Sequence, residues 1–203
     1  LTFGKRATEP NASPDGRTIA FRRNDQAQSR LAFLDVATGD ITEVAPVSRI
    51  GQVYTPRFSP DGKQVAFSAW REGGYRDIYL YDRETGTTRR LTADRHMDLS
   101  PSWSPDGRHV IFSSDRDGVF NVYALEVATG EMRQVSNVLG AAFEPMVSHD
   151  GTQIAYVAAS GGRQQLHLRA VDRSDATILP GTEQAFAPFF SFSPSVFSVE
   201  SRI

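Results

Sequence analysis

The sequence predicts an all-β fold built from repeated four-stranded antiparallel units, and three observations support this prediction. A proline recurs every 43 to 46 residues, and a Ser-Pro-Asp-Gly motif or a variant of it follows the first four of these prolines. The apolar residues alternate with period two. The recurring prolines are Pro10, Pro56, Pro101, Pro145 and Pro188. Almost no segment has the 3.6-residue period of a helix, so we expect strands and turns throughout.

The first half of each unit predicts two strands joined by a tight turn. The aligned segments read NASPDGRTIAF, RFSPDGKQVAF, SWSPDGRHVIF and MVSHDGTQIAY. Glycine adopts positive φ without steric cost, so each Asp-Gly pair favours a hairpin turn, with the Asp accepting local backbone hydrogen bonds. We therefore assign a structural role to Asp15, Gly16, Asp61, Gly62, Asp106, Gly107, Asp150 and Gly151.

The second half of each unit predicts two more strands and completes a recognisable module. Runs such as Ile78-Tyr79-Leu80-Tyr81 are typical of strands buried on both faces, and a Thr-Gly turn follows in the first three units, at Gly39, Gly86 and Gly130. A looser loop separates the two halves: REGGYRD, SDRDGVFN and ASGGRQQ contain glycine, whereas RRNDQAQSR in the first unit does not. Four-stranded units of about 45 residues are the blades of a β-propeller.

Four complete blades are predicted, at about 9–45, 55–92, 100–136 and 144–180. Leu1-Thr2 matches the end of a preceding blade, and APFFS at 187–191 matches the first strand of a fifth. Residues 192–203 form an off-pattern C-terminal tail, because no Asp-Gly turn follows there. We expect residues 1–191 to be a piece of a larger propeller, since an open stack leaves exposed blade faces; a self-pairing oligomer and an unusually small ring are the alternatives.

The composition excludes several classes of partner. A formal net charge of −2 lacks the basic excess of nucleic-acid or anionic-membrane binders. With no cysteine, disulfides and thiolate metal sites are excluded. No apolar run of the length that spans a membrane occurs, so we expect no membrane insertion.

Variable loops on one face of the blades are the predicted recognition surface. The Asp-Gly and Thr-Gly turns share the other face and are short and uniform, whereas the second-to-third-strand loops and the links between blades differ from unit to unit. The candidates are Arg49, Trp70, Arg71, Tyr75, Arg76, Arg95, His96, Asp98, Arg116, Phe143 and Glu144. Trp, Tyr and Arg commonly anchor protein interfaces. In the alternative interpretation Trp70 and Tyr75 pack between blades and the arginines pair with Asp77 or Asp117.

Neither a metal site nor a catalytic site is predicted. Asp115-Arg116-Asp117-Gly118 resembles the start of a calcium loop, but the further ligands are missing, so we expect a plain turn. The four histidines have no metal-ligand spacing. No Gly-x-Ser-x-Gly, His-Glu-x-x-His or Gly-x-x-x-x-Gly-Lys motif occurs, so we expect no catalytic residue and no cofactor.

The repeat resembles the TolB-like, Pro-Asp type propeller repeat, a relative of WD-repeat propellers. The resemblance rests on the Ser-Pro-Asp-Gly motif, the IAF strand, DIYLYD and the closing RRLT. The resemblance covers residues 1 to about 190 and implies a periplasmic or cell-envelope location and a non-catalytic domain that binds a protein or peptide. It also leaves an alternative, in which the propeller is an accessory gate or sensor of a larger enzyme, such as a prolyl-oligopeptidase-like or tricorn-like peptidase or a bacterial Ser/Thr kinase.

Overall fold

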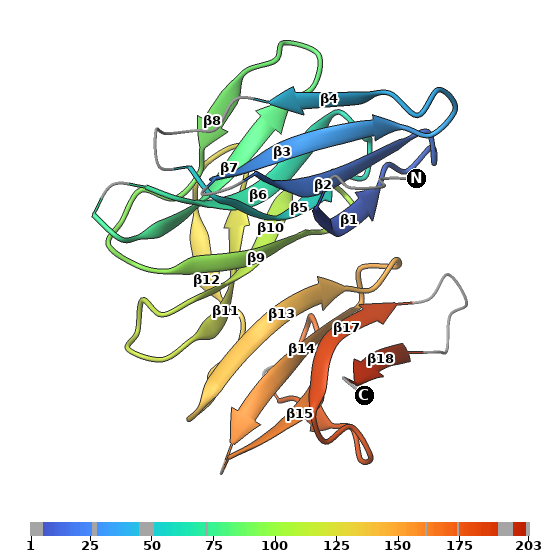
Figure 1. The fold of residues 1–203 in the computed structure, drawn as a ribbon. Helices are drawn as coiled ribbons and strands as arrows, with labels where there is room; N and C mark the ends of the chain where they lie inside the picture. Colours follow the sequence, from blue (N-terminus) through green and yellow to red (C-terminus); the bar gives the residue numbers. More distant parts are fainter. Residues whose placement is uncertain are drawn as a thin grey trace. The chain divides into compact units, whose positions relative to one another are not determined.

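The computed structural model describes residues 6–25, 28–44, 51–71, 73–160, 162–173, 175–190 and 197–201. Every regular element in these ranges is a β-strand, as the sequence predicts (Figure 1). No helix long and apolar enough to cross a membrane is found among the described residues. Leu1-Thr2, the predicted end of a preceding blade, and the candidate Arg49 lie outside the described residues.

The chain divides into two compact units, Leu1–Pro101 and Ser102–Ile203. Four antiparallel sheets of four strands follow one another along it, each with its strands in chain order. The strands are β1 (Ala7–Ala12), β2 (Thr18–Asp25), β3 (Gln28–Asp35), β4 (Ile41–Val44), β5 (Val53–Phe58), β6 (Gln64–Trp70), β7 (Arg76–Asp82), β8 (Thr88–Arg90), β9 (Asp98–Trp103), β10 (His109–Ser114), β11 (Asn121–Glu126), β12 (Met132–Gln134), β13 (Ala141–Val147), β14 (Gln153–Ser160), β15 (Arg163–Ala170) and β16 (Thr177–Ile178). We call these sheets blades 1 to 4.

A shorter sheet follows blade 4. Strand β17 (Ala185–Phe190) contains most of the predicted fifth-blade strand and pairs antiparallel with β18 (Phe197–Ser201). Part of the off-pattern tail is therefore a strand, although no Asp-Gly turn precedes it. Strand pairing needs only an extended backbone with free hydrogen-bonding groups, so β18 forms without the Ser-Pro-Asp-Gly motif from which the strands of the blades are predicted.

The Asp-Gly turns have one geometry in all four blades. In the first, Ser13 N donates to Thr18 O at 2.8 Å, and the Ser13 hydroxyl donates to Asp15 at 2.6 Å. The Asp15 carboxylate also accepts from Arg17 N at 3.0 Å. The four glycines have φ values of 69°, 71°, 70° and 74°, in the left-handed region that favours glycine. This local hydrogen bonding sets the register of the first two strands in each blade.

The cores form where neighbouring blades pack face to face, which is why the middle strands are buried on both faces. In the first unit, Phe58, Val65, Phe67 and Leu31 are buried in one cluster. In the second unit a cluster of the same kind includes buried Ile111, Ile154 and Tyr156. Burial of such side chains is the main favourable contribution to folding.

A bulge interrupts the first strand of blades 1, 2 and 4 directly before the recurring proline, and the backbone of blade 3 has the same positive φ there. The residue before the proline has positive φ although it is never glycine: 55° at Glu9, 47° at Thr55, 52° at Ser100 and 51° at Glu144. The pairing register shifts here in blades 1, 2 and 4. This conformation is not predictable from the sequence, because residues before proline usually favour the extended region.

Two side chains of β1 hold the bulged strand of the next blade. The Glu9 carboxylate accepts from Thr55 N at 2.7 Å, and the Asn11 amide oxygen accepts from Phe58 N at 2.8 Å. Strands β1 and β5, 46 residues apart in the sequence, are thus joined by side-chain-to-backbone hydrogen bonds.

Candidate functional site at the loop end of blade 2

The loop between β6 and β7 brings an arginine against a tyrosine at the variable end of blade 2. Arg71 N donates to Tyr75 O at 3.0 Å, and Gly73 and Gly74 adopt φ values of 96° and 81° that close the turn. The Arg71 guanidinium carbon lies 5.0 Å from the centre of the Tyr75 ring. Both side chains are partly exposed, so the pair is a cation–π contact at the surface.

Two more guanidinium groups lie against the ring of Tyr54, at the start of β5. The Arg22 and Arg76 guanidinium carbons lie 4.1 Å and 4.0 Å from the centre of its ring. The Trp70 indole N–H donates to the Tyr54 hydroxyl at 3.3 Å, and that hydroxyl is hydrogen-bonded to the Gln52 side chain. We call Arg22, Tyr54, Trp70 and Arg76 the aromatic–arginine cluster.

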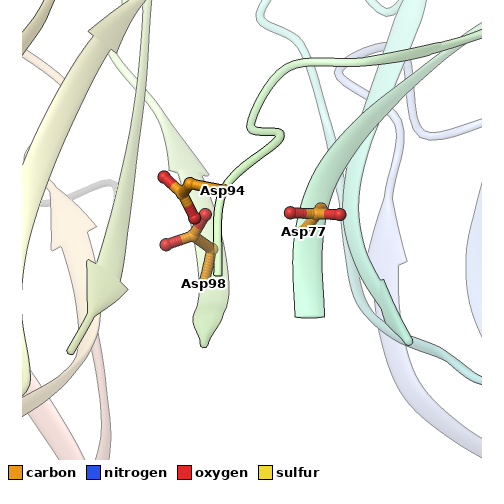
Figure 2. A group of neighbouring side chains, drawn as sticks. All are labelled: Asp77, Asp94 and Asp98. Atoms are coloured by element: carbon orange, nitrogen blue, oxygen red, sulfur yellow. The ribbon is translucent and has the colours of Figure 1, made fainter. Parts of the chain in front are cut away.

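Three carboxylates lie close together in the same unit. Asp77 on β7 has Asp94 and Asp98 of the following segment beside it (Figure 2), and one carboxylate oxygen from each lies within 4.8 Å of the others. Asp77 and Asp98 have 0% exposure. Two arginines compensate for the Asp77 charge: its Oδ2 lies 2.9 Å from Arg71 Nε and 3.5 Å from Arg90 Nη1.

Burial raises the pKa of Asp77 from 3.8 to about 6. Arg71 and Arg90 act in the opposite direction, and the neighbouring charges of Asp98 and Asp94 raise the pKa further. Removal from water is the largest cause, so the arginines only partly offset the cost of ionising this buried carboxyl. Among the described residues these three aspartates are the group whose geometry could hold a cation, but Arg71 and Arg90 already lie against Asp77 Oδ2.

The structure brings five of the predicted candidates together around these features: Trp70, Arg71, Tyr75, Arg76 and Asp98. In the adjoining link Arg95 is exposed, and His96 N donates to the Asp94 carboxylate at 3.2 Å. The ion pair between Arg71 and Asp77 agrees with the alternative interpretation of the arginines. Tyr54, Arg22 and Asp94 were not predicted, because Tyr54 and Arg22 sit on strands whose contact depends on how blade 1 packs against blade 2.

The remaining candidates lie in the second unit and pack differently. The Arg116 guanidinium carbon lies 4.9 Å from the Tyr123 ring centre and 5.6 Å from that of Phe112, and Arg116 Nε donates to Ser114 Oγ at 3.0 Å. Phe143 packs on Phe120 with 4.9 Å between ring centres. Glu144 is the residue of positive φ before the blade 4 proline.

The segment that resembled a calcium loop forms a turn. Gly118 N donates to Asp115 O at 2.8 Å, and Gly118 has a φ of 88°. The Asp117 carboxylate accepts from the Tyr123 hydroxyl. One of the acidic groups that suggested a metal therefore binds a neighbouring tyrosine.

Sequential four-stranded meanders, each about 45 residues after the last, define the β-propeller class of repeat protein. The chain belongs to the TolB β-propeller domain family, whose sequence model matches residues 5–199. A curated relative, the Tol-Pal system protein TolB of Francisella tularensis subsp. mediasiatica (strain FSC147), is 33% identical over 86 residues, which are 41% of this chain and 19% of that protein.

Solved structures agree with the family assignment. TolB from Acinetobacter baumannii superposes with a TM-score of 0.82 at 28% identity, over 92% of this chain and 46% of that one. A putative TolB from Agrobacterium tumefaciens gives 0.77 at 28% identity, over 92% and 65%. A puromycin hydrolase gives 0.75 at 22% identity, over 99% and 35%, which is a likeness of fold alone. The chain thus spans less than two thirds of each of these proteins.

Proposed function

We propose that this chain is the non-catalytic, partner-binding propeller part of a bacterial cell-envelope protein, and that the loop end of blade 2 recognises a protein or peptide. The observation that carries the proposal is the group of aromatic rings and guanidinium groups there. Tyr54, Trp70 and Tyr75 are partly exposed, and arginines lie against all three rings. Aromatic and arginine side chains on a rigid scaffold are the commonest anchors of protein interfaces.

The buried carboxylates support this proposal by fixing the arginine that carries one of the contacts. Arg71 is paired with Asp77 through Nε and also donates to the backbone carbonyl of Asp94. A guanidinium held in this way loses little side-chain entropy when a partner binds. The loop is therefore pre-organised for recognition.

The family supports the proposed location. Its TolB relatives are named as Tol-Pal system proteins, and we extend that envelope setting to this chain. We further propose that the chain carries no catalytic residue and needs no cofactor. The accessory role in a larger enzyme rests on the fold alone, and sequencing the coding region on both sides of this segment would test it: an adjoining peptidase or kinase domain would favour that role.

Capture of envelope proteins by matched variants tests the binding proposal. Tyr75→Ala combined with Arg95→Ala removes two loop side chains and leaves the Asp77 ion pairs intact, whereas Lys63→Ala with Glu84→Ala changes the hairpin end of the same blade. We expect the immobilised wild-type chain and the hairpin variant to retain the same envelope proteins and the loop variant to lose them. Equal retention by all three would contradict the assignment of the binding surface.

A further inference from the structure

A cavity of about 370 Å³ lies in the second unit, between blades 3 and 4, at the end of the strands where the Asp-Gly turns are. Ile111 on β10, Ala124 on β11, Val147 on β13 and Ile154 on β14 give it apolar walls. An apolar cavity less than half this size accommodates a benzene molecule in another protein. The volume is thus sufficient for an aromatic side chain.

Charged groups surround the apolar walls. Asp106 and Asp150 of the two turns line the cavity together with His109 and Arg133. The hydroxyl groups of the turn serines hold the pKa of both aspartates below the usual range, so their carboxylates are ionised at neutral pH. Asp106, Asp150 and Arg133 are exposed, so the site has a polar rim and an apolar interior.

The first unit contains the equivalent slot, and there aromatic rings fill it. Phe33 on β3 corresponds to Ala124 on β11, since each is the third residue of the LAFLD-type segment and pairs with the last strand of its blade. Phe58 corresponds to Val147, directly before the turn serine. The centres of the Phe33 and Phe58 rings are 6.1 Å apart, at an interplanar angle of 51°.

The turns confirm that the two slots are equivalent. A methyl group added to Gly62 would lie 3.4 Å from Pro14 Cδ, and one added to Gly151 would lie 3.6 Å from Pro105 Cδ. In both units the turn of the second blade therefore rests on the turn proline of the first. At the positions of Phe33 and Phe58 the second unit has the smaller side chains Ala124 and Val147, whereas Ile111 is larger than its counterpart Ala20.

An arginine completes the filled slot. The Arg83 guanidinium carbon lies 5.7 Å from the Phe33 ring centre and 5.1 Å from that of Phe58, and Arg83 donates to Gly62 O at 2.8 Å. The corresponding residue of blade 4 is Val171. In the second unit the cation that lines the cavity is Arg133, which comes from β12.

We propose that the cavity between blades 3 and 4 binds one aromatic side chain of a partner polypeptide, which takes the place that Phe33 and Phe58 occupy in the first unit. The ring contacts Ile111, Val147 and Ile154, and Arg133 supplies the cation–π contact that Arg83 makes in the filled slot. This site lies at the turn end of the blades, so it is independent of the proposed recognition surface at the loop end of blade 2.

Titration of the methyl-labelled chain with N-acetyl-tryptophanamide, N-acetyl-phenylalaninamide and N-acetyl-leucinamide tests the proposal by NMR. We expect the two aromatic probes to move the Ile111, Val147 and Ile154 methyl signals through the ring current. The leucine probe should bind at least ~5-fold more weakly, because it lacks ring–cation contacts. Methyl signals that stay unchanged up to the solubility limit of the aromatic probes, or equal binding of the leucine probe, would overturn the proposal.

Two variants make the test reciprocal. Ala124→Phe with Val147→Phe rebuilds the filled slot and should abolish the aromatic response, whereas binding as in the wild type would refute the location. Phe33→Ala with Phe58→Val opens the slot of the first unit and should make the Leu31 and Val65 methyl signals respond to the same probes. Because the wild-type titration already decides whether the cavity binds a ring, the test does not depend on either variant folding.

Discussion

Replacing Asp77 with asparagine should stabilise this protein at neutral pH. Asp77 is fully buried, and its pKa is raised from 3.8 to about 6, mainly by burial. Blade 3 shows that an amide fits the equivalent position, because Asn121 there accepts hydrogen bonds from Ser136 Oγ at 3.0 Å and Val138 N at 2.9 Å. Asparagine keeps the shape of the side chain and removes the buried charge.

The magnitude follows from proton linkage. Between pH 3.8 and about 6 the folded chain binds more protons at Asp77 than the unfolded chain, so this group's contribution to stability falls as the pH rises. Above that range the full cost of keeping the carboxylate ionised is present, about 3 kcal/mol at about 1.4 kcal/mol for each pKa unit. This figure already includes the ion pairs, because the pKa of about 6 is the net result of burial and of the opposing charges of Arg71 and Arg90.

Urea denaturation of the wild type and Asp77→Asn at pH 4.0 and pH 7.5 measures the effect. We expect the variant to be more stable by about 1–3 kcal/mol at pH 7.5, with most of that difference gone at pH 4.0. Glu84→Gln removes an exposed charge from the following hairpin and should show no such pH dependence. A variant that is less stable than the wild type at pH 7.5 would refute the reasoning. So would a variant whose free energy of unfolding differs from that of the wild type by the same amount at both pH values.

Three further substitutions test other parts of the fold by chemical denaturation. Gly107→Val places a β-branched residue at a φ of 70° and should lower the stability by roughly 1–3 kcal/mol, whereas Gly107→Asn should lower it much less. A Gly107→Val variant as stable as the wild type would contradict the turn assignment. Asn121→Ala removes the acceptor for Ser136 and Val138 and should lower the free energy of unfolding by about 1–3 kcal/mol. A denaturation midpoint equal to that of the wild type would contradict this expectation. Thr55→Gly relieves a φ of 47° and removes a buried hydroxyl that has no hydrogen-bond partner, so stability should stay the same or rise by up to about 1 kcal/mol; a clear loss would show that the bulge is not strained.

The repeat made most of the fold predictable from the sequence, because turns and strand alternation are local properties. The side chains of the Ser-Pro-Asp-Gly motif form hydrogen bonds within the turn itself, and the Asp15 carboxylate accepts them from Ser13 Oγ and Arg17 N. Strand β18 was harder to predict, since no Ser-Pro-Asp-Gly motif precedes it.

The candidate site was only partly predictable, because it depends on contacts between blades. Trp70, Arg71, Tyr75 and Arg76 stand out in the variable loop, but Tyr54 looks like an ordinary strand residue until Arg22 of blade 1 is placed beside it. Likewise, the replacement of Phe33 by Ala124 is visible in the alignment of the repeats. Its meaning depends on which residues of the next blade face that position.

The hydrogen bonds from β1 to β5 bear on how such a repeat folds. Within a blade, strand pairing is local and can form early, whereas the Glu9–Thr55 and Asn11–Phe58 hydrogen bonds need two blades in place and a main chain already bent into the left-handed region. Their formation secures the bulge of one blade with side chains of the blade before it. A blade is therefore a unit of sequence but not a unit of stability, and hydrogen exchange should show the amides of Thr55 and Phe58 opening only when blades 1 and 2 come apart.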